Sequence, residues 1–248
     1  MTAGAVAAGT GLRDTLSRLS GAQKGAAGAP AYSRFVNRKL GRVLAALAFH
    51  AGLTPNAVTG ISAAFTGAGI ALLALAPHGW ATGIAVAACL VVGYAFDAAD
   101  GQLARLRGGG SPAGEWLDHM VDAAKIGSLH LALLIGLYRA DDVARELLLI
   151  PLGFSVVSVV LFFATLLNEA LRAQHGAPTR AAPTAQRPGA VRSLLAAPTD
   201  YGVLCLVFVL LGAPALFLAG YGALFAATAA YLALATVKWF KEMGRLAA

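Results

Sequence analysis

Six long apolar segments constrain this chain more than any other feature of its sequence. A helix needs about 20 consecutive apolar residues to cross the hydrocarbon core of a bilayer. The segments run from Pro55 to Leu75, Trp80 to Leu106, Pro112 to Tyr138, Leu147 to Leu171, Tyr201 to Ala219 and Tyr221 to Trp239. Only 12% of the residues are charged, whereas soluble domains carry about 25%. The sequence therefore predicts an all-α integral membrane protein with six transmembrane helices.

The residues before the first apolar segment divide into two parts. Residues 32–51 end in apolar sequence and begin with four cations: Arg34, Arg38, Lys39 and Arg42. This pattern predicts an amphipathic juxtamembrane helix that lies at the membrane surface. Residues 1–31 are rich in small and polar residues, and we expect them to form a mobile N-terminal tail. The six-helix membrane domain is then expected to cover residues 32–248.

The basic residues predict how the chain is oriented in the membrane. Nearly all of the 19 Lys and Arg residues lie before the first segment, near the second and fourth connections, or at the C-terminus. The opposite connections hold only Arg139 and Arg145. Because cytoplasmic loops are enriched in Lys and Arg, both termini are predicted to lie on the cytoplasmic side of the cytoplasmic membrane. This pattern explains the net charge of +7 without nucleic acid as a partner, and a basic face suits anionic membrane lipids.

Four aspartates lie together at the junction between the second and third apolar segments. On a helical wheel, with about 100° between successive residues, the first two share one helix face with three neighbours: Asp97, Asp100, Gly101, Ala104 and Arg105. The other two share a face of the next helix with a lysine: Asp118, Asp122 and Lys125. A short turn with three consecutive glycines reverses the chain between the two helices. The two acidic faces are therefore predicted to meet.

Four neighbouring carboxylates need a compensating charge. Like charges and burial both disfavour ionisation of a carboxyl group, and a charge within a membrane span costs at least about 2.5 kcal/mol. Carboxylate oxygens are ligands suited to Mg²⁺, Mn²⁺ or Ca²⁺, and two divalent cations would balance four aspartates. Arg105, on the face of Asp97 and Asp100, could then bind a phosphate that bridges the metals.

The spacing of these residues is Asp97-x2-Asp100-Gly101-x2-Ala104-Arg105-x8-Gly114-x3-Asp118-x3-Asp122. It resembles the signature of the CDP-alcohol phosphotransferase family, also called the CDP-alcohol phosphatidyltransferase family (class I), at all eight positions. The resemblance implies a six-span helical enzyme, commonly a homodimer, with a cavity that faces the cytoplasm. It also implies that a substituted phosphate passes from a CDP-alcohol to a second alcohol, with release of CMP and with Mg²⁺ or Mn²⁺ as cofactor.

The same resemblance assigns roles to the motif residues. Asp97, Asp100 and Asp118 would bind metal, and Asp122 would share that role and act as general base on the acceptor hydroxyl, beside Asp118 as the other catalytic carboxylate. Residues that would line the CDP site are Asp97, Asp100, Gly101, Ala104, Arg105 and Gly114. The stretch LTPNAVTG at the start of the first span resembles a Thr-Pro-Asn-x-x-Thr segment of related enzymes, which makes Asn56 and Thr59 further candidates for CDP binding. Helix capping by Thr54 or Asn56, with Pro55 in the first turn, is the alternative interpretation of that stretch.

Several basic residues are candidates for binding the acceptor. They are Lys125, Arg172, Arg180, Arg187 and Arg192. For Lys125 the alternative is an ion pair with a neighbouring carboxylate. For the arginines it is the ordinary excess of positive charge on the cytoplasmic side.

The motif leaves the substrates open. The basic loops suit a phosphorylated polyol as acceptor, such as inositol phosphate or glycerol 3-phosphate, and we favour CDP-diacylglycerol as its donor. The stretch SPAGEWLDHMVD has some likeness to choline and ethanolamine phosphotransferases, which use a CDP-headgroup donor and diacylglycerol. A cation carrier that uses intramembrane carboxylates is a third hypothesis, but it does not account for Gly101, Arg105 and Gly114 at these spacings.

Overall fold

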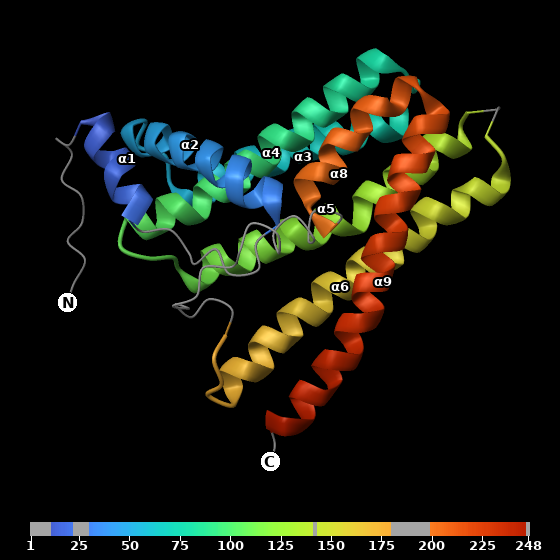
Figure 1. Ribbon diagram of the computed structural model, residues 1–248. Helices are drawn as coiled ribbons and strands as arrows, with labels where there is room; N and C mark the ends of the chain where they lie inside the picture. Colours follow the sequence, from blue (N-terminus) through green and yellow to red (C-terminus); the bar gives the residue numbers. More distant parts are fainter. Residues whose placement is uncertain (1–10, 22–29, 141–142, 180–198, 247–248) are drawn as a thin grey trace.

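Every regular element of the chain that could be placed is helical. The computed structural model describes residues 11–21, 30–140, 143–179 and 199–246 (Figure 1). Five of the described helices are long and apolar enough to cross a membrane: α3 (Pro55–Leu75), α4 (Trp80–Leu106), α5 (Pro112–Tyr138), α6 (Leu149–Gln174, preceded by the 3-10 helix η2, Arg145–Leu148) and α9 (Pro214–Leu246). The prediction of an all-α, multi-pass membrane protein is confirmed.

The first three long helices begin and end at the residues that the sequence predicts. At the start of α3, the Thr54 side chain accepts a hydrogen bond from the Ala57 N–H (3.2 Å) and Pro55 occupies the first turn. Ser111 caps α5 in the same way, through the Gly114 N–H (3.1 Å). These caps satisfy donors that the first helical turn leaves without partners. The capping interpretation of Thr54 is therefore confirmed.

The last third of the chain departs from the predicted boundaries. The predicted span from Tyr201 to Ala219 is instead a short helix, α8 (Tyr201–Val207), that continues as the 3-10 helix η4 (Phe208–Gly212). The helix breaks at Ala213, whose φ and ψ are −131° and 79°, and α9 begins at Pro214. The sixth span predicted from Tyr221 therefore starts seven residues earlier. Gly212 and Pro214 mark this break in the sequence, but hydropathy does not, because the residues are apolar on both sides.

The N-terminal segment holds a helix where the sequence predicts a mobile tail. Leu12–Gly21 form α1, and the Leu19 side chain is buried in a cluster with Ala45 and Ala46 of α2 (Arg38–His50). The Thr15 hydroxyl lies 3.2 Å from Nε2 of His50. Thr15 and Leu19 are one helical turn apart and form a buried face, so this part of the predicted tail is helical. Most of the remaining tail lies outside the described residues.

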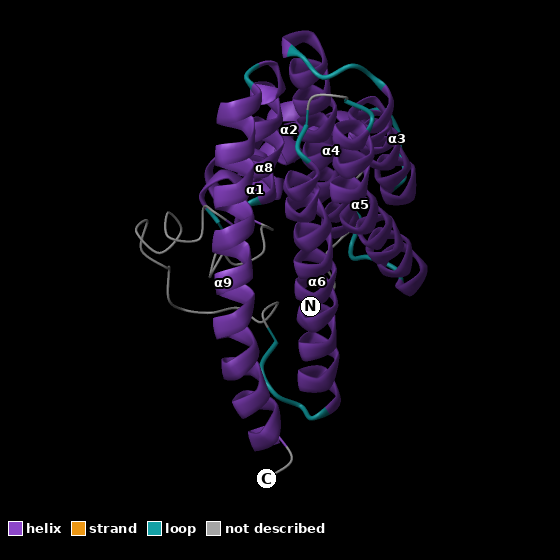
Figure 2. Cartoon of the chain, turned by 90° about the vertical axis from the view of Figure 1, so that its right-hand side faces the viewer, coloured by secondary structure: helices purple, strands orange, loops and turns teal. Residues whose placement is uncertain are grey.

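Helix α4 lies at the centre of the packing. It contacts α2 and α3 along much of its length, and α8 and η4 on another side. The main apolar core includes Leu90 of α4, Leu133 of α5, Phe208 of η4 and Tyr221 of α9. Figures 1 and 2 show α6 and α9 running together toward the end of the molecule that carries the C-terminus. This arrangement places the end of α4 and the start of α5, with the four aspartates, among α2, α3 and α8.

Close packing of α3 on α4 depends on Gly93. The Ser62 hydroxyl donates to the Gly93 carbonyl (2.8 Å), and a methyl group at Gly93 would overlap Oγ1 of Thr66. We expect Gly93→Ala to lower the free energy of unfolding by about 1–3 kcal/mol, because overpacking forces the helices apart. Thermal unfolding of the detergent-solubilised protein measures this change. Gly67→Ala on α3 is the matched control, since its methyl group would meet no atom within 4 Å; equal midpoints for the two variants would contradict the prediction.

Candidate active site

The turn between α4 and α5 brings the two acidic helix faces together. Gly108 and Gly109 adopt φ values of +99° and +131°, a region that residues with a side chain rarely enter. The Gly109 N–H donates to the Ala104 carbonyl (2.9 Å). Arg107 donates to the Leu53 carbonyl (2.7 Å), which ties the turn to the connection before α3. The glycines therefore allow the chain to reverse within a few residues of both aspartate pairs.

The carboxylate of Asp100 accepts a hydrogen bond from a side chain of α3. The Thr59 hydroxyl on α3 donates to Oδ2 of Asp100 (2.7 Å), and both side chains are buried. Thr59 also lies 3.1 Å from the Pro55 carbonyl, one turn earlier on its helix. The structure thus gives Thr59 a partner within the protein. The hydrogen bond orients Asp100 in the way that a carboxylate ligand requires.

The two motif glycines have different surroundings. A methyl group at Gly114 would lie 3.1 Å from Oδ1 of Asn56 and 3.3 Å from Oγ of Ser111. Gly114 therefore allows the start of α5 to approach α3 closely. A methyl group at Gly101 would meet only the Arg105 guanidinium, at an ordinary contact distance of 3.5 Å. Packing thus explains Gly114, whereas the surface of Gly101 is open to a ligand beside Arg105.

Lys125 pairs with aspartates from both helices. Its ammonium lies 3.5 Å from Oδ1 of Asp97 on α4 and forms an ion pair with Asp122 on its own helix. The Lys125 side chain is only 9% exposed, so these charges attract each other with little screening by water. The ion-pair interpretation of Lys125 is confirmed, and its binding to an acceptor stays a prediction.

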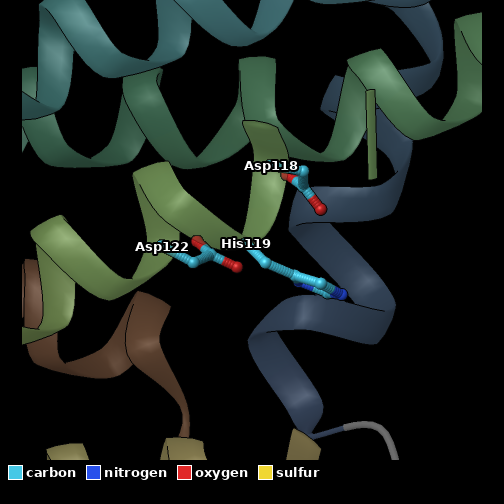
Figure 3. A group of neighbouring side chains, drawn as sticks. All are labelled: Asp118, His119 and Asp122. Atoms are coloured by element: carbon cyan, nitrogen blue, oxygen red, sulfur yellow. The ribbon is translucent and has the colours of Figure 1, made fainter. Parts of the chain in front are cut away.

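A second group of side chains gathers around the start of α5. Ligand atoms of Asp118, His119 and Asp122 all lie within 4.8 Å of one another. Figure 3 shows the three side chains projecting from α5, with the Asp122 carboxylate directed toward His119. Nδ1 of His119 is buried and has no hydrogen-bond partner among the described residues. On the helical wheel His119 only flanks the acidic face, about 100° around the helix from Asp118, so its position in sequence favours a surface or packing role.

The acidic residues fit a divalent cation. Atoms bound to one Mg²⁺ or Mn²⁺ lie about 2.0–2.2 Å from the ion, so ligands about 4 Å apart can share it. The spacing of Asp118 and Asp122 requires only a small side-chain movement to satisfy this distance. Asp97 is linked to Asp122 through Lys125, and Asp100 follows Asp97 by one turn of α4. The four carboxylates of the motif are therefore the residues that could hold metal.

The predicted acceptor arginines do not gather at this site among the described residues. Nη2 of Arg172 lies 2.6 Å from Oε2 of Glu242 on α9, and Nη1 donates to the Pro178 carbonyl (3.2 Å). This pair links the ends of α6 and α9. Arg180, Arg187 and Arg192 lie outside the described residues. Among the predicted acceptor residues that the structure describes, Lys125 is the one at the aspartates.

The motif and its geometry agree with a comparison against protein families. The family model for CDP-alcohol phosphatidyltransferase matches residues 52–239, most of the chain. The chain belongs to this family. The matched region begins before α3 and ends near the close of α9, so it contains all eight motif residues and the helices that position them.

A curated relative is phosphatidylinositol phosphate synthase of Corynebacterium glutamicum. It is 36% identical over 118 residues, which cover 48% of this chain and 52% of the relative. The match thus spans about half the length of that enzyme.

Two solved structures have the same fold, and both are phosphatidylinositol phosphate synthase of Mycobacterium tuberculosis. The one in complex with manganese and citrate is 23% identical, with a TM-score of 0.54, and the alignment covers 79% of this chain and 87% of the other. The one with CDP-diacylglycerol bound is 24% identical, with a TM-score of 0.53, and covers 80% and 90%. At these identities the likeness establishes the fold alone.

The hydrogen bond from Thr59 predicts how metal affinity responds to mutation. Thr59→Val removes the donor to Asp100 at nearly constant volume, and we expect it to weaken Mn²⁺ binding by about 10–100-fold, because groups that orient a ligand carry effects of this size. Electron paramagnetic resonance of free Mn²⁺ in titrations of the purified protein measures the affinity. Thr59→Ser, which keeps the hydroxyl, is the control. Wild-type affinity in Thr59→Val would show that Asp100 needs no such orientation.

Proposed function

We propose that this protein is a metal-dependent CDP-alcohol phosphotransferase that transfers a phosphatidyl group from CDP-diacylglycerol to a phosphorylated polyol and releases CMP. The observation that carries the proposal is the convergence of Asp97 and Asp122 on Lys125, with Asp118 close to Asp122, in a chain that matches the family over most of its length. CDP-diacylglycerol is the ligand bound in one of the similar structures, and the relatives named above are phosphatidylinositol phosphate synthases.

In this proposal the four aspartates hold two divalent cations, Mg²⁺ or Mn²⁺. Bound cations would neutralise the diphosphate and the charge that develops on the leaving oxygen. The open surface of Gly101, with Ala104 and Arg105, receives the CDP group. Gly114 and Asn56 complete the wall of that site, because the two lie against each other. Thr59 contributes by orienting Asp100.

Asp122 is the proposed general base. It takes the proton of the acceptor hydroxyl as the hydroxyl oxygen forms a bond to the phosphorus that carries the diacylglycerol. The bond between that phosphorus and the oxygen of CMP breaks, and the electron pair leaves with CMP. Lys125, which already lies between Asp97 and Asp122, is placed to attract an anionic acceptor. Arg172, Arg180, Arg187 and Arg192 are weaker candidates for the same role.

The comparisons support a CDP-diacylglycerol donor over the alternatives. Both named relatives, one of them solved in two structures, are phosphatidylinositol phosphate synthases, whereas the choline and ethanolamine enzymes use a CDP-headgroup donor. Membership of the family also argues against a cation carrier.

We further propose that the enzyme is a homodimer and that residues 32–248 form its catalytic membrane domain, with α2 as the juxtamembrane helix. The exposed side chains Leu40, Val43 and Leu47 on one face of α2 support that placement.

We propose six membrane crossings, with α8 and η4 as one short crossing. The two helices together rise about 20 Å. Tyr201, at the start of α8, lies beside Lys125 at the level of the aspartates. Gly212, at the end of η4, lies against the Trp80 ring at the opposite end of α4. A sixth crossing places both termini and the aspartates on one side, which the distribution of Lys and Arg indicates is the cytoplasm of the cytoplasmic membrane.

Single cysteines test this topology. In a variant with Cys89 and Cys205 replaced by Ala, we expect Gly110→Cys and Gly244→Cys to react with a membrane-impermeant maleimide only when the cytoplasmic face is accessible. Ala140→Cys should react from outside intact cells, because it follows α5 at the other face. If α8 and η4 do not cross, Gly244→Cys will instead react from outside, as Ala140→Cys does.

Release of CMP tests the activity. With CDP-diacylglycerol, Mn²⁺ and inositol phosphate, we expect the purified protein to release CMP. Asp97→Ala and Asp118→Ala should each reduce the rate on the order of 100-fold or more, because loss of a metal ligand has a larger effect than loss of a residue that only orients a ligand. Asp14→Ala is the control, since Asp14 is exposed, lies outside the motif and pairs with Arg18 on its own helix α1. Chelation of divalent cations should stop the reaction in the wild type.

The same assay identifies the acceptor. Glycerol 3-phosphate, inositol and serine replace inositol phosphate in parallel reactions, and the acceptor with the highest kcat/KM is assigned. Absence of CMP with every acceptor, or full activity in Asp97→Ala, would refute the proposed function.

A further inference from the structure

An aromatic ring lies against the ammonium of Lys125, which forms ion pairs with two of the motif aspartates. The centroid of the Tyr201 ring is 5.2 Å from Nζ of Lys125. An ammonium at this distance from an aromatic ring is attracted by its electron-rich face, most strongly where water is excluded. Lys125 therefore has two kinds of partner: the carboxylates of Asp97 and Asp122, and the ring of Tyr201.

Tyr201 is held in place by the residue before it. Oδ1 of Asp200 accepts from the Gly202 N–H (3.1 Å) and caps α8, while Oδ2 accepts from the Ser33 N–H (3.1 Å) at the start of the π-helix η1 (Ser33–Asn37). Asp200 is 2% exposed. Burial raises the pKa of its carboxyl group, and these hydrogen bonds oppose the rise. The start of α8 is thus fixed to the segment that precedes α2.

Two further tyrosines support the Tyr201 ring. Tyr94, one turn before Asp97 on α4, meets Tyr201 edge to face with ring centroids 5.1 Å apart. Tyr32 stacks on Tyr94 with ring centroids 6.4 Å apart and also packs against Gly202, where a methyl group would overlap its ring. Aromatic pairs in these geometries stabilise each other. The ring that contacts Lys125 is therefore part of a wall built from three distant parts of the chain.

In the proposed reaction Lys125 shares its carboxylate partners with the metal ions, and the Tyr201 ring offers it another partner. Asp97 and Asp122 are the partners of Lys125 and also proposed metal ligands, and a carboxylate lone pair directed at a divalent cation is not available to an ammonium. The ring face of Tyr201 binds no divalent cation in this way. The ring can therefore keep the Lys125 ammonium in place when the carboxylates of Asp97 and Asp122 coordinate metal ions.

We propose that Tyr201 is a positioning residue whose ring keeps the Lys125 ammonium at the aspartates for the anionic group of the acceptor. This inference rests on the proposed function and adds Tyr201 to it. Tyr201 acts through Lys125 and is not itself in contact with the reacting atoms.

Two substitutions separate the ring from the rest of the side chain. Tyr201→Leu removes the ring, and Tyr201→Phe keeps it. We expect Tyr201→Leu to raise the KM for inositol phosphate about tenfold, the size expected of one partly desolvated cation–π contact, with the KM for CDP-diacylglycerol changed less than about threefold. Tyr201→Phe should retain both values. Tyr138→Leu, at an exposed tyrosine beyond the end of the core, is the control for loss of a tyrosine.

A graded series covers the case in which Tyr201→Leu does not fold. Phenylalanine analogues with one, two and three ring fluorines at position 201 preserve the shape of the ring while weakening its attraction for a cation. The KM for inositol phosphate should rise with each fluorine. A flat series, or an equal rise in the KM for both substrates, would overturn the role of Tyr201. Absence of CMP release in the wild type would instead count against the proposed function.

Discussion

Confinement of four carboxylates at the edge of a membrane is the constraint on which the rest of this structure depends. An ionised carboxylate without a partner would raise the free energy of the folded protein there. Side chains from several helices provide such partners. Lys125 binds Asp97 and Asp122, and Thr59 donates to Asp100. These contacts require α3, α4 and α5 to converge at one point. The close helix packing at Gly93 and Gly114 follows from that requirement.

The same constraint suits the proposed donor, which has a polar and an apolar part. The aspartates lie at one end of long helices whose outer surfaces expose apolar side chains suited to lipid. A donor that carries both acyl chains and a nucleotide needs such a boundary between the two environments. The fold shared with the mycobacterial synthases provides it by placing the turn between α4 and α5 at the end of the apolar core.

Local signals made the first half of the fold predictable. Thr54 with Pro55 and Ser111 with Pro112 mark the starts of α3 and α5, and the helical wheel placed the aspartates on facing surfaces. The break at Ala213 has a local signal, since Gly212 and Pro214 flank it. Hydropathy alone predicts one span to Ala219, because apolar residues continue through the break. The contact of Tyr201 with Lys125 has no such signal, since no local pattern relates residues so far apart in sequence.

The hydrogen bond between Ser33 and Asp200 has a consequence for the order in which the protein is made. Its two residues are 167 positions apart, and a chain emerges from the ribosome beginning with its N-terminus. The segment before α2 must therefore wait, without its final partner, until four long helices have been synthesised. A chain truncated before Asp200 would contain all eight motif residues and still lack the support behind Lys125. Completion of the site is in this sense a late event of biogenesis.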